Sequence, residues 1–103
     1  MGALPLLLAA ATAGAEIGAV RQAELLGLLK NDCGSCHGLT LRGGLGPALT
    51  PPALTGKSPA MLRAVILEGR PGTPMAPWRP FLNDAEAAWL VEQLRSGVVG
   101  DAH

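Results

Sequence analysis

The sequence predicts an all-α domain in which three main helices are joined by long, irregular loops. Three segments carry apolar residues at helical spacing, and each is bounded by residues that start or stop helices. No stretch of the sequence shows convincing strand alternation. Glycine and proline concentrate between residues 38 and 80, so this part is expected to form loops, and long loops inside a small domain usually line a site.

The first predicted helix runs from Ile17 or Ala19 to Lys30. Asn31-Asp32 is expected to end it, because these residues favour caps and turns. Its apolar stripe consists of Val20, Leu25, Leu28 and Leu29.

The second predicted helix has a clear start, with Ser58 as N-cap and Pro59 at the first helical position. Gly69 is a natural C-terminal stop. The expected buried face consists of Leu62, Val65 and Ile66.

The third predicted helix begins at Asn83, and Glu86 three residues later completes a variant of the capping box. Gly97 is expected to close the helix. Its apolar face consists of Ala87, Leu90, Val91 and Leu94, with Trp89 at the edge.

The first 15 residues predict a signal peptide, and residues 16–103 predict a single domain. The apolar run from Leu4 to Ala11 is too short to span a bilayer, and Ala13-Gly14-Ala15 follows it as a cleavage site. A Lys or Arg before the run is missing, which leaves a buried or membrane-lying helix as the alternative. We therefore expect an exported chain without stable membrane insertion. The formal charge of +0 gives no basic footprint for nucleic acid.

Two cysteines and a histidine follow the first helix as Cys33-Gly34-Ser35-Cys36-His37. This C-x-x-C-H arrangement is the signature of covalent attachment of a c-type haem. The two thiols can add across the haem vinyl groups, and the histidine is then held under the iron as its proximal ligand. The motif predicts one covalent haem c, held by Cys33, Cys36 and His37, and hence a protein that handles electrons.

Three other interpretations of the two thiols compete with haem attachment, besides an incidental pair. A disulfide is plausible in an exported chain. A thioredoxin-like redox pair needs a βαβ pattern, and no strand precedes the motif. A zinc site needs a further Cys or His, and the other histidine is His103 at the C-terminus.

Met75 is the candidate for the sixth iron ligand. It lies in a loop whose prolines at 71, 74 and 77 fix backbone φ, and a stiff loop can hold a weakly bound thioether against iron. Met61, in the first turn of the second helix, is more typical of core, and His103 would need the tail to fold back. Histidine and methionine together fill both axial positions and favour a relatively high reduction potential.

With these residues, the chain resembles a small monohaem cytochrome c with His and Met ligands. Its order is the family's: N-terminal helix, C-x-x-C-H, glycine-rich loop, middle helix, methionine loop and C-terminal helix. The resemblance implies that the carbonyl of Pro47, in Gly46-Pro47, accepts a hydrogen bond from the His37 imidazole. It also implies that Trp89-Leu90 contacts the N-terminal helix, with Leu25 and Gly27 as possible partners. The expected fold is thus a small cytochrome c fold wrapped around one covalently attached haem.

The chain resembles the NirC-like cytochromes of bacterial denitrification clusters in the amino-acid sequence of three segments, residues 37–41, 43–51 and 69–78. That family often has proline after the ligand methionine, where this chain has Ala76. The resemblance implies a periplasmic, monomeric one-electron carrier that serves cytochrome cd1 nitrite reductase, or alternatively an accessory donor in haem d1 maturation. A five-coordinate haem sensor or enzyme is a third hypothesis.

The expected path for electrons is an open haem edge near the thioethers. Apolar residues around Cys36, the 43–47 loop and the Met75 to Trp78 loop would ring it, so Trp78 is a candidate haem neighbour. Arg42, Arg70 and Arg79 are candidates for local positive charge or for pairing with haem propionates.

Overall fold

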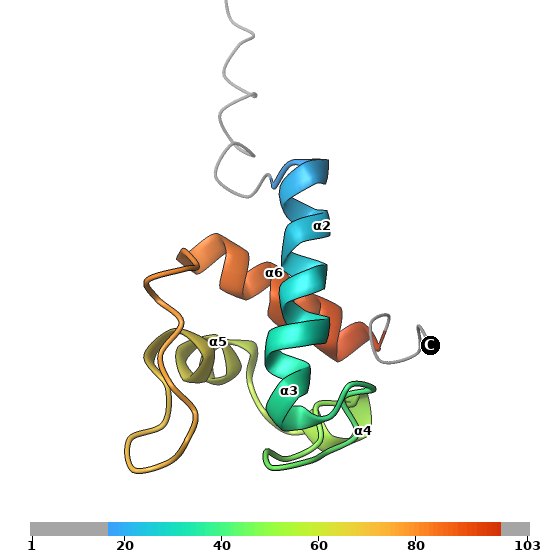
Figure 1. Ribbon diagram of the computed structural model, residues 1–103, viewed down its shortest axis with the longest axis vertical. Coiled ribbons are helices and arrows are strands. Elements are labelled where there is room, and N and C mark those ends of the chain that lie inside the picture. Colours follow the sequence, from blue (N-terminus) through green and yellow to red (C-terminus); the bar gives the residue numbers. More distant parts are fainter. Residues whose placement is uncertain (1–16, 98–103) are drawn as a thin grey trace, which may run out of the picture.

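The computed structural model describes residues 17–97, and within them the chain is helical with no strand, so the predicted fold class is confirmed. The predicted signal peptide (1–15), its cleavage site and His103 lie outside the described residues. No helix between residues 17 and 97 is long and apolar enough to cross a membrane. The elements, shown in Figure 1, are α2 (Ala19–Leu28), the π-helical turn η2 (Leu29–Cys33), α3 (Gly34–His37), α4 (Pro51–Leu54), α5 (Pro59–Glu68) and α6 (Asp84–Ser96).

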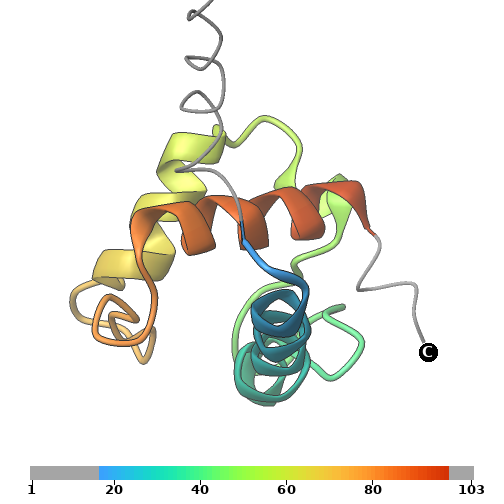
Figure 2. The same ribbon diagram turned by 90° about the horizontal axis from the view of Figure 1, so that it is seen from above.

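The core lies where α2 and α5 pack against α6. Figures 1 and 2 show α2 crossing α6 on one side, while α5 packs against another part of α6. Trp89 is half-buried and packs against the cluster that contains Leu25, whereas a Cβ at Gly27 would meet no atom within 4 Å. The buried cluster consists of Leu25, Leu29, Leu41, Leu54, Leu67, Leu82, Ala87, Leu90 and Leu94.

The prediction that the first helix ends at Asn31-Asp32 is wrong. The helical backbone continues through η2 and α3, and it stops at Gly38, whose φ is 94°. Asn31 does not cap the helix, because its Nδ2 donates instead to the Gly27 carbonyl at 2.9 Å. Packing of Leu29 and Cys33 against the core outweighs the weak local preference of Asn and Asp for a helix end.

A short helix also interrupts the stretch before Lys57 that was expected to be irregular throughout. α4 begins with Pro51 at its first position, where the missing N–H of proline costs nothing. Leu54 is buried on its inner side, and Thr55 Oγ1 donates to the Pro51 carbonyl at 3.1 Å. Proline within a helix breaks it, but at the first position Pro51 starts one.

The start and stop residues of α5 and α6 are as predicted. Ser58 Oγ accepts from the Met61 N–H at 3.0 Å, and α5 ends at Gly69. Asn83 and Glu86 cap each other reciprocally, and Gly97 ends α6 in the left-handed conformation. The predicted face of α6 is buried, whereas the buried residue of α5 is Leu67, and its predicted face is only half-buried.

An ion-pair network ties α2 to the start of α6. Arg21 Nε donates to Glu86 Oε2 at 2.7 Å, and Arg21 Nη2 donates to the Phe81 carbonyl at 3.2 Å. Glu24 joins the network at 3.1 Å from Arg21 Nη1. Since Glu86 also caps α6, one carboxylate fixes both helices, and its pKa is lowered by Arg21 first and by the Asn83 backbone N–H as well.

Candidate haem site

The C-x-x-C-H motif occupies the end of the first helix. Cys33 closes η2, and Cys36 and His37 belong to α3. Because a spacing of three residues places side chains on one helix face, both thiols project from the same side of this segment. Cys33, Cys36 and His37 are all half-buried, which leaves each of them within reach of a ligand.

The electrostatics of Cys33 differ from those of a redox-active thiol. Burial, followed by the charges of Asp32 and Cys36, raises the pKa of the Cys33 thiol to about 11. Reactive pairs of the thioredoxin type depend on a lowered thiol pKa, so this environment counts against that alternative. Residues 17–97 also contain no group of three or more His, Cys, Asp and Glu side chains that could hold a metal ion.

The imidazole of His37 is oriented by a backbone carbonyl. His37 Nδ1 lies 2.7 Å from the Pro47 oxygen, the contact that the resemblance implies. A carbonyl oxygen can only accept, so Nδ1 carries the proton and Nε2 keeps its lone pair. The hydrogen bond thus selects the tautomer, and the ring orientation, in which Nε2 can bind iron.

The loop after the motif folds back onto the motif's own backbone. Gly43 N donates to the His37 carbonyl at 2.8 Å, and Gly46 N donates to the Cys36 carbonyl at 2.7 Å. A Cβ at Gly46 would lie 2.7 Å from Cε1 and Nδ1 of His37, which is closer than real Cβ contacts. Only glycine therefore lets the backbone pass this close to the imidazole.

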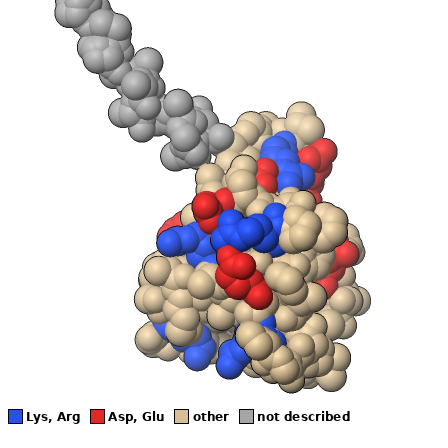
Figure 3. Space-filling model, turned by 90° about the vertical axis from the view of Figure 1, so that its left-hand side faces the viewer, with Lys and Arg blue, Asp and Glu red and all other residues tan. Residues whose placement is uncertain are grey.

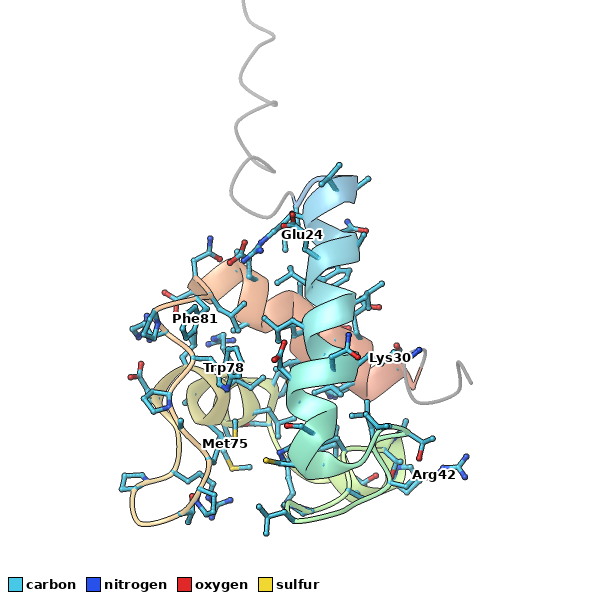
Figure 4. The ribbon with its side chains drawn as sticks, in the orientation of Figure 1. Glu24, Lys30, Arg42, Met75, Trp78 and Phe81 are labelled. Carbon is cyan, nitrogen blue, oxygen red and sulfur yellow. The ribbon has the colours of Figure 1, made fainter. Side chains whose placement is uncertain are left out.

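Met75 lies in a loop, residues 69–79, whose backbone is braced on both sides of this residue. Its carbonyl accepts from the Arg70 N–H at 3.0 Å, and its own N–H donates to Thr73 Oγ1 at 3.2 Å. The loop is closed at its base by Trp78 N, which donates to the Ile66 carbonyl at 3.0 Å. Met75 is half-buried, and Figure 4 shows it pointing from this loop toward α3.

Trp78 lies between Met75 and Phe81 in Figure 4. Its ring is half-buried against the core cluster and stands 5.4 Å from the Phe81 ring, centroid to centroid, at a tilt of 58°. Packing of the methionine loop onto the core is therefore the role that the contacts give to Trp78.

The three candidate arginines differ in their surroundings. Arg79 forms ion pairs with Glu68 and, at 3.5 Å, with Asp84, so its charge is compensated at the base of the methionine loop. Arg42 and Arg70 form no ion pair with any residue between 17 and 97.

The donor set fits a c-type haem. The residues offer two thiols on one helix face, an imidazole with a free Nε2, and a thioether held on a separate loop that points toward that helix. Two surface hollows, of about 500 and 250 Å³, lie beside α4 and the end of α6, and none of the six predicted site residues lines them.

A helical domain that presents this donor set has the features of a small c-type cytochrome. The comparison with family models agrees with this class. The chain belongs to the family described as "Cytochrome C oxidase, cbb3-type, subunit III", whose model matches residues 21–93.

Comparison with individual proteins shows which c-type cytochromes the chain is similar to. The chain is 58% identical over 79 residues to cytochrome c55X of Pseudomonas aeruginosa, a match that covers 77% of this chain and 66% of the relative. It is 57% identical to the solved structure of the c-type cytochrome NirC, with a TM-score of 0.79, covering 81% of this chain and 98% of that one. A third similarity is to a structure of the dihydro-heme d1 dehydrogenase NirN in complex with DHE, at 45% identity and a TM-score of 0.63, covering 67% of this chain and 15% of that chain.

Two supporting residues were not identified from the sequence. Gly46 leaves room for the imidazole, and Thr73 accepts the Met75 N–H. Thr73 had a local signal, because a threonine hydroxyl in a turn often accepts a hydrogen bond from the backbone N–H two residues later, here that of Met75. Gly46 had none beyond its place before Pro47, since the close approach depends on how the loop folds back.

Proposed function

We propose that the protein carries one electron at a time on a single haem c. Cys33 and Cys36 would attach the group covalently, and His37 and Met75 would be its axial ligands. When bound, the haem supplies a ferric/ferrous couple. The observation that carries the proposal is the orientation of His37 by Pro47, at 2.7 Å, opposite a methionine loop with braced backbone.

The surrounding residues suit electron transfer better than chemistry on a substrate. His37 and Met75 both belong to segments braced by hydrogen bonds, so neither would need to leave the iron when the haem changes oxidation state. A neutral thioether favours the reduced state and a relatively high potential. With His37 and Met75 both holding the iron, no coordination site would be left for a substrate, and the protein would act as a carrier and not as an enzyme.

The partner we propose is a periplasmic redox protein, and cytochrome cd1 nitrite reductase is the first candidate, with the carrier acting as a monomer. The predicted signal peptide and the similarity to NirC support this setting. The second candidate role is electron transfer during haem d1 maturation. It is favoured by the similarity to one part of a dihydro-heme d1 dehydrogenase.

The visible absorption spectrum of the periplasmic product tests the cofactor and its ligands. We expect haem that stays attached after denaturation, and a weak thioether-associated band near the red end of the ferric spectrum. Ferrous protein should bind little carbon monoxide at neutral pH. Ready binding would show an open sixth position and contradict the carrier proposal.

The two partner roles are separated by a deletion strain together with the purified proteins. A respiratory donor reduces cytochrome cd1 nitrite reductase directly, and its deletion leaves that enzyme with its haem d1. A maturation protein fails to reduce the enzyme, and its deletion leaves the enzyme without haem d1.

A further inference from the structure

One side chain of the methionine loop, residues 69–79, links two parts of the loop's backbone through its hydroxyl group. We propose that this residue, Thr73, is a positioning residue that holds the backbone of Met75 at the end of α5 and so sets how long Met75 stays on the haem iron. The inference rests on the proposed function, in which Met75 is the sixth ligand. It adds the residue that controls the lifetime of that ligand.

Arg70 and Met75 face each other across the loop, and one direct backbone hydrogen bond joins them. The Arg70 N–H donates to the Met75 carbonyl at 3.0 Å. In a regular antiparallel pair, a second bond would run back from the Met75 N–H to the Arg70 carbonyl. Here the Met75 N–H donates to Thr73 Oγ1 at 3.2 Å, and Thr73 Oγ1 donates to the Arg70 carbonyl at 2.7 Å. The hydroxyl therefore lies between the two backbone groups and replaces the second bond.

A hydroxyl group suits this place because it donates one hydrogen bond and accepts others at the same time. Thr73 is exposed, so water can satisfy either backbone group alone, but water is not tied to the chain. The Thr73 N–H also donates to the Arg70 carbonyl at 3.0 Å, which fixes the backbone that carries the hydroxyl. Pro74 restricts the short path from Thr73 to Met75, because its ring fixes φ and limits the preceding residue. The link is thus rigid on both sides.

The end of α5 is the surface against which Met75 is held. Gly69 ends this helix with a φ of 73°, and a Cβ on it would lie 2.7 Å from the Met75 carbonyl oxygen and 2.8 Å from Pro77 N. The backbone after the helix therefore packs directly on Gly69, with no room for a side chain. For Met75 to move away, this close contact must open, and the link through Thr73 opposes that opening.

The position of the loop connects this brace with the candidate haem site. Figure 1 shows the loop extending from α5 to the end of the molecule where α3 lies, and Figure 4 shows the Met75 side chain directed from the loop toward α3. A thioether is a neutral ligand that binds iron weakly. How readily its sulfur leaves the iron therefore depends on how firmly the backbone of Met75 is held.

The rate of cyanide binding to the ferric, haem-loaded protein measures this lifetime. The bond between iron and the Met75 sulfur must break before the cyanide carbon takes its place, so at saturating cyanide the rate equals the rate of Met75 release. Thr73→Val removes the hydroxyl and keeps the branched side chain. We expect this variant to raise the limiting rate about tenfold, because two hydrogen bonds of ordinary strength are lost. Thr73→Ser keeps a hydroxyl and should stay within about twofold of the unmodified protein.

Thr55→Val is the matched control. Thr55 Oγ1 donates to the Pro51 carbonyl at 3.1 Å in α4, so this substitution removes a hydroxyl that bonds a backbone carbonyl outside the methionine loop. It should lower Tm and leave the limiting rate unchanged, so that a faster rate in Thr73→Val is not a consequence of lower overall stability.

Surface charge is the same in all of these variants. Figure 3 faces the side of the molecule on which the methionine loop lies, and it shows Lys and Arg as well as Asp and Glu atoms on that side. Since threonine, valine and serine are uncharged, the attraction between this surface and the cyanide anion does not change. A difference in limiting rate therefore reports the loop itself.

Hydrogen exchange of the Met75 amide gives a second readout that needs no added ligand. In Thr73→Val this amide loses its acceptor, and its exchange with solvent, followed by NMR, should become about tenfold faster. The Gly69 amide is the reference within the same protein, because it donates to the Val65 carbonyl at 2.9 Å and not to the loop. Its exchange rate should change much less.

Two results would overturn the proposal. In the first, Thr73→Val binds cyanide at the same limiting rate as Thr55→Val. In the second, Thr73→Ser binds it as fast as Thr73→Val, which would show that the hydroxyl does not hold Met75. The electron-carrier function fails by a different result, in which the unmodified ferric protein lacks the thioether-associated band and its rate of cyanide binding rises with concentration without reaching a limit.

Discussion

His37 Nδ1 and the Pro47 carbonyl oxygen lie 2.7 Å apart, and they come from opposite ends of an eleven-residue segment that folds back on itself. The turn depends on Gly46, whose absent Cβ leaves the space that the imidazole fills. The orientation of the iron-binding nitrogen is therefore set by a backbone path and not by a second side chain. This arrangement gives the first of four predictions.

Gly46→Ala should displace the His37 ring. The new Cβ would lie 2.7 Å from two ring atoms, and overpacking of this kind costs about 1–3 kcal/mol. We expect a lower yield of haem-loaded protein and a changed reduction potential, measured by absorbance and by redox titration. Gly27→Ala is the control, because its Cβ meets no atom within 4 Å and alanine favours the helix. An unchanged potential in Gly46→Ala would contradict the role given to this glycine.

Met75→Ala should open the sixth coordination position. The ferrous variant is expected to bind carbon monoxide readily, to lose the thioether-associated absorption and to have a lower reduction potential. Met61→Ala is the matched control, because Met61 is 44% exposed on the first turn of α5. If Met61→Ala shows these changes and Met75→Ala does not, Met61 is the ligand. If Met75→Ala matches the unmodified protein, Met75 does not bind iron.

Glu86→Gln should reduce stability at neutral pH and remove part of the acid sensitivity. The pKa of Glu86 is lowered below its ordinary value of 4.5, mainly by Arg21, so its stabilisation is present above pH 4.5 and is lost as pH falls through the folded-state pKa. We expect Tm to fall by about 4 °C at pH 7 and the difference from the unmodified protein to shrink below pH 4.5.

Glu92→Gln serves as the control for that experiment. Glu92 pairs with Arg95 at 3.7 Å on an exposed helix face and caps nothing. Its removal should leave Tm nearly unchanged at both pH values. Equal effects of the two substitutions would show that the link between α2 and α6 contributes no special stability.

Cys33 should be a slow nucleophile before haem is attached. Burial raises its pKa to about 11 from an ordinary value of 9.0, so the folded apoprotein holds little thiolate at pH 7 to 8. In a Cys36→Ser variant, the rate of iodoacetamide labelling should rise about tenfold per pH unit through this range and continue rising toward pH 11.

The raised pKa of Cys33 also makes the stability of the folded apoprotein depend on pH. Below pH 9.0 the thiol is protonated in both states, and between that value and about 11 the unfolded chain loses its proton first, so the apoprotein becomes less stable as pH rises. The chemically unfolded variant is the comparison for labelling, and its rate should level off near pH 9.0. A folded-state rate that levels off at the same pH would contradict the burial of this thiol.

The predictable parts of the fold were those with local signals. Ser58, Asn83 and Gly97 mark the helix ends they were predicted to mark, because capping involves neighbouring backbone groups. Cys33, Cys36 and His37 were predicted from the local spacing in C-x-x-C-H, and Met75 from its proline-rich loop, whereas Pro47 was implied by the resemblance to small cytochromes c.

The features that the sequence did not predict depend on contacts through space. The helix continues past Asn31 because Leu29 and Cys33 pack into a core cluster that also contains residues distant in sequence, such as Leu67 and Leu90. α4 forms where Leu54 reaches the same core. The closeness of Gly46 to His37 depends on the path of a whole loop, which no single residue specifies.

The backbone bonds from Gly43 to His37 and from Gly46 to Cys36 join residues only six and ten positions apart, so the segment around His37 can close on its own with little loss of loop entropy. The segment around Met75 is held by a separate set of bonds to α5. The two halves of the candidate site are held by separate sets of backbone hydrogen bonds, so we expect the methionine side to open without unfolding of the histidine side. A brief opening of this kind would expose one face of the cofactor without unfolding the domain, and it would set the lifetime of the six-coordinate state separately from the stability of the protein as a whole.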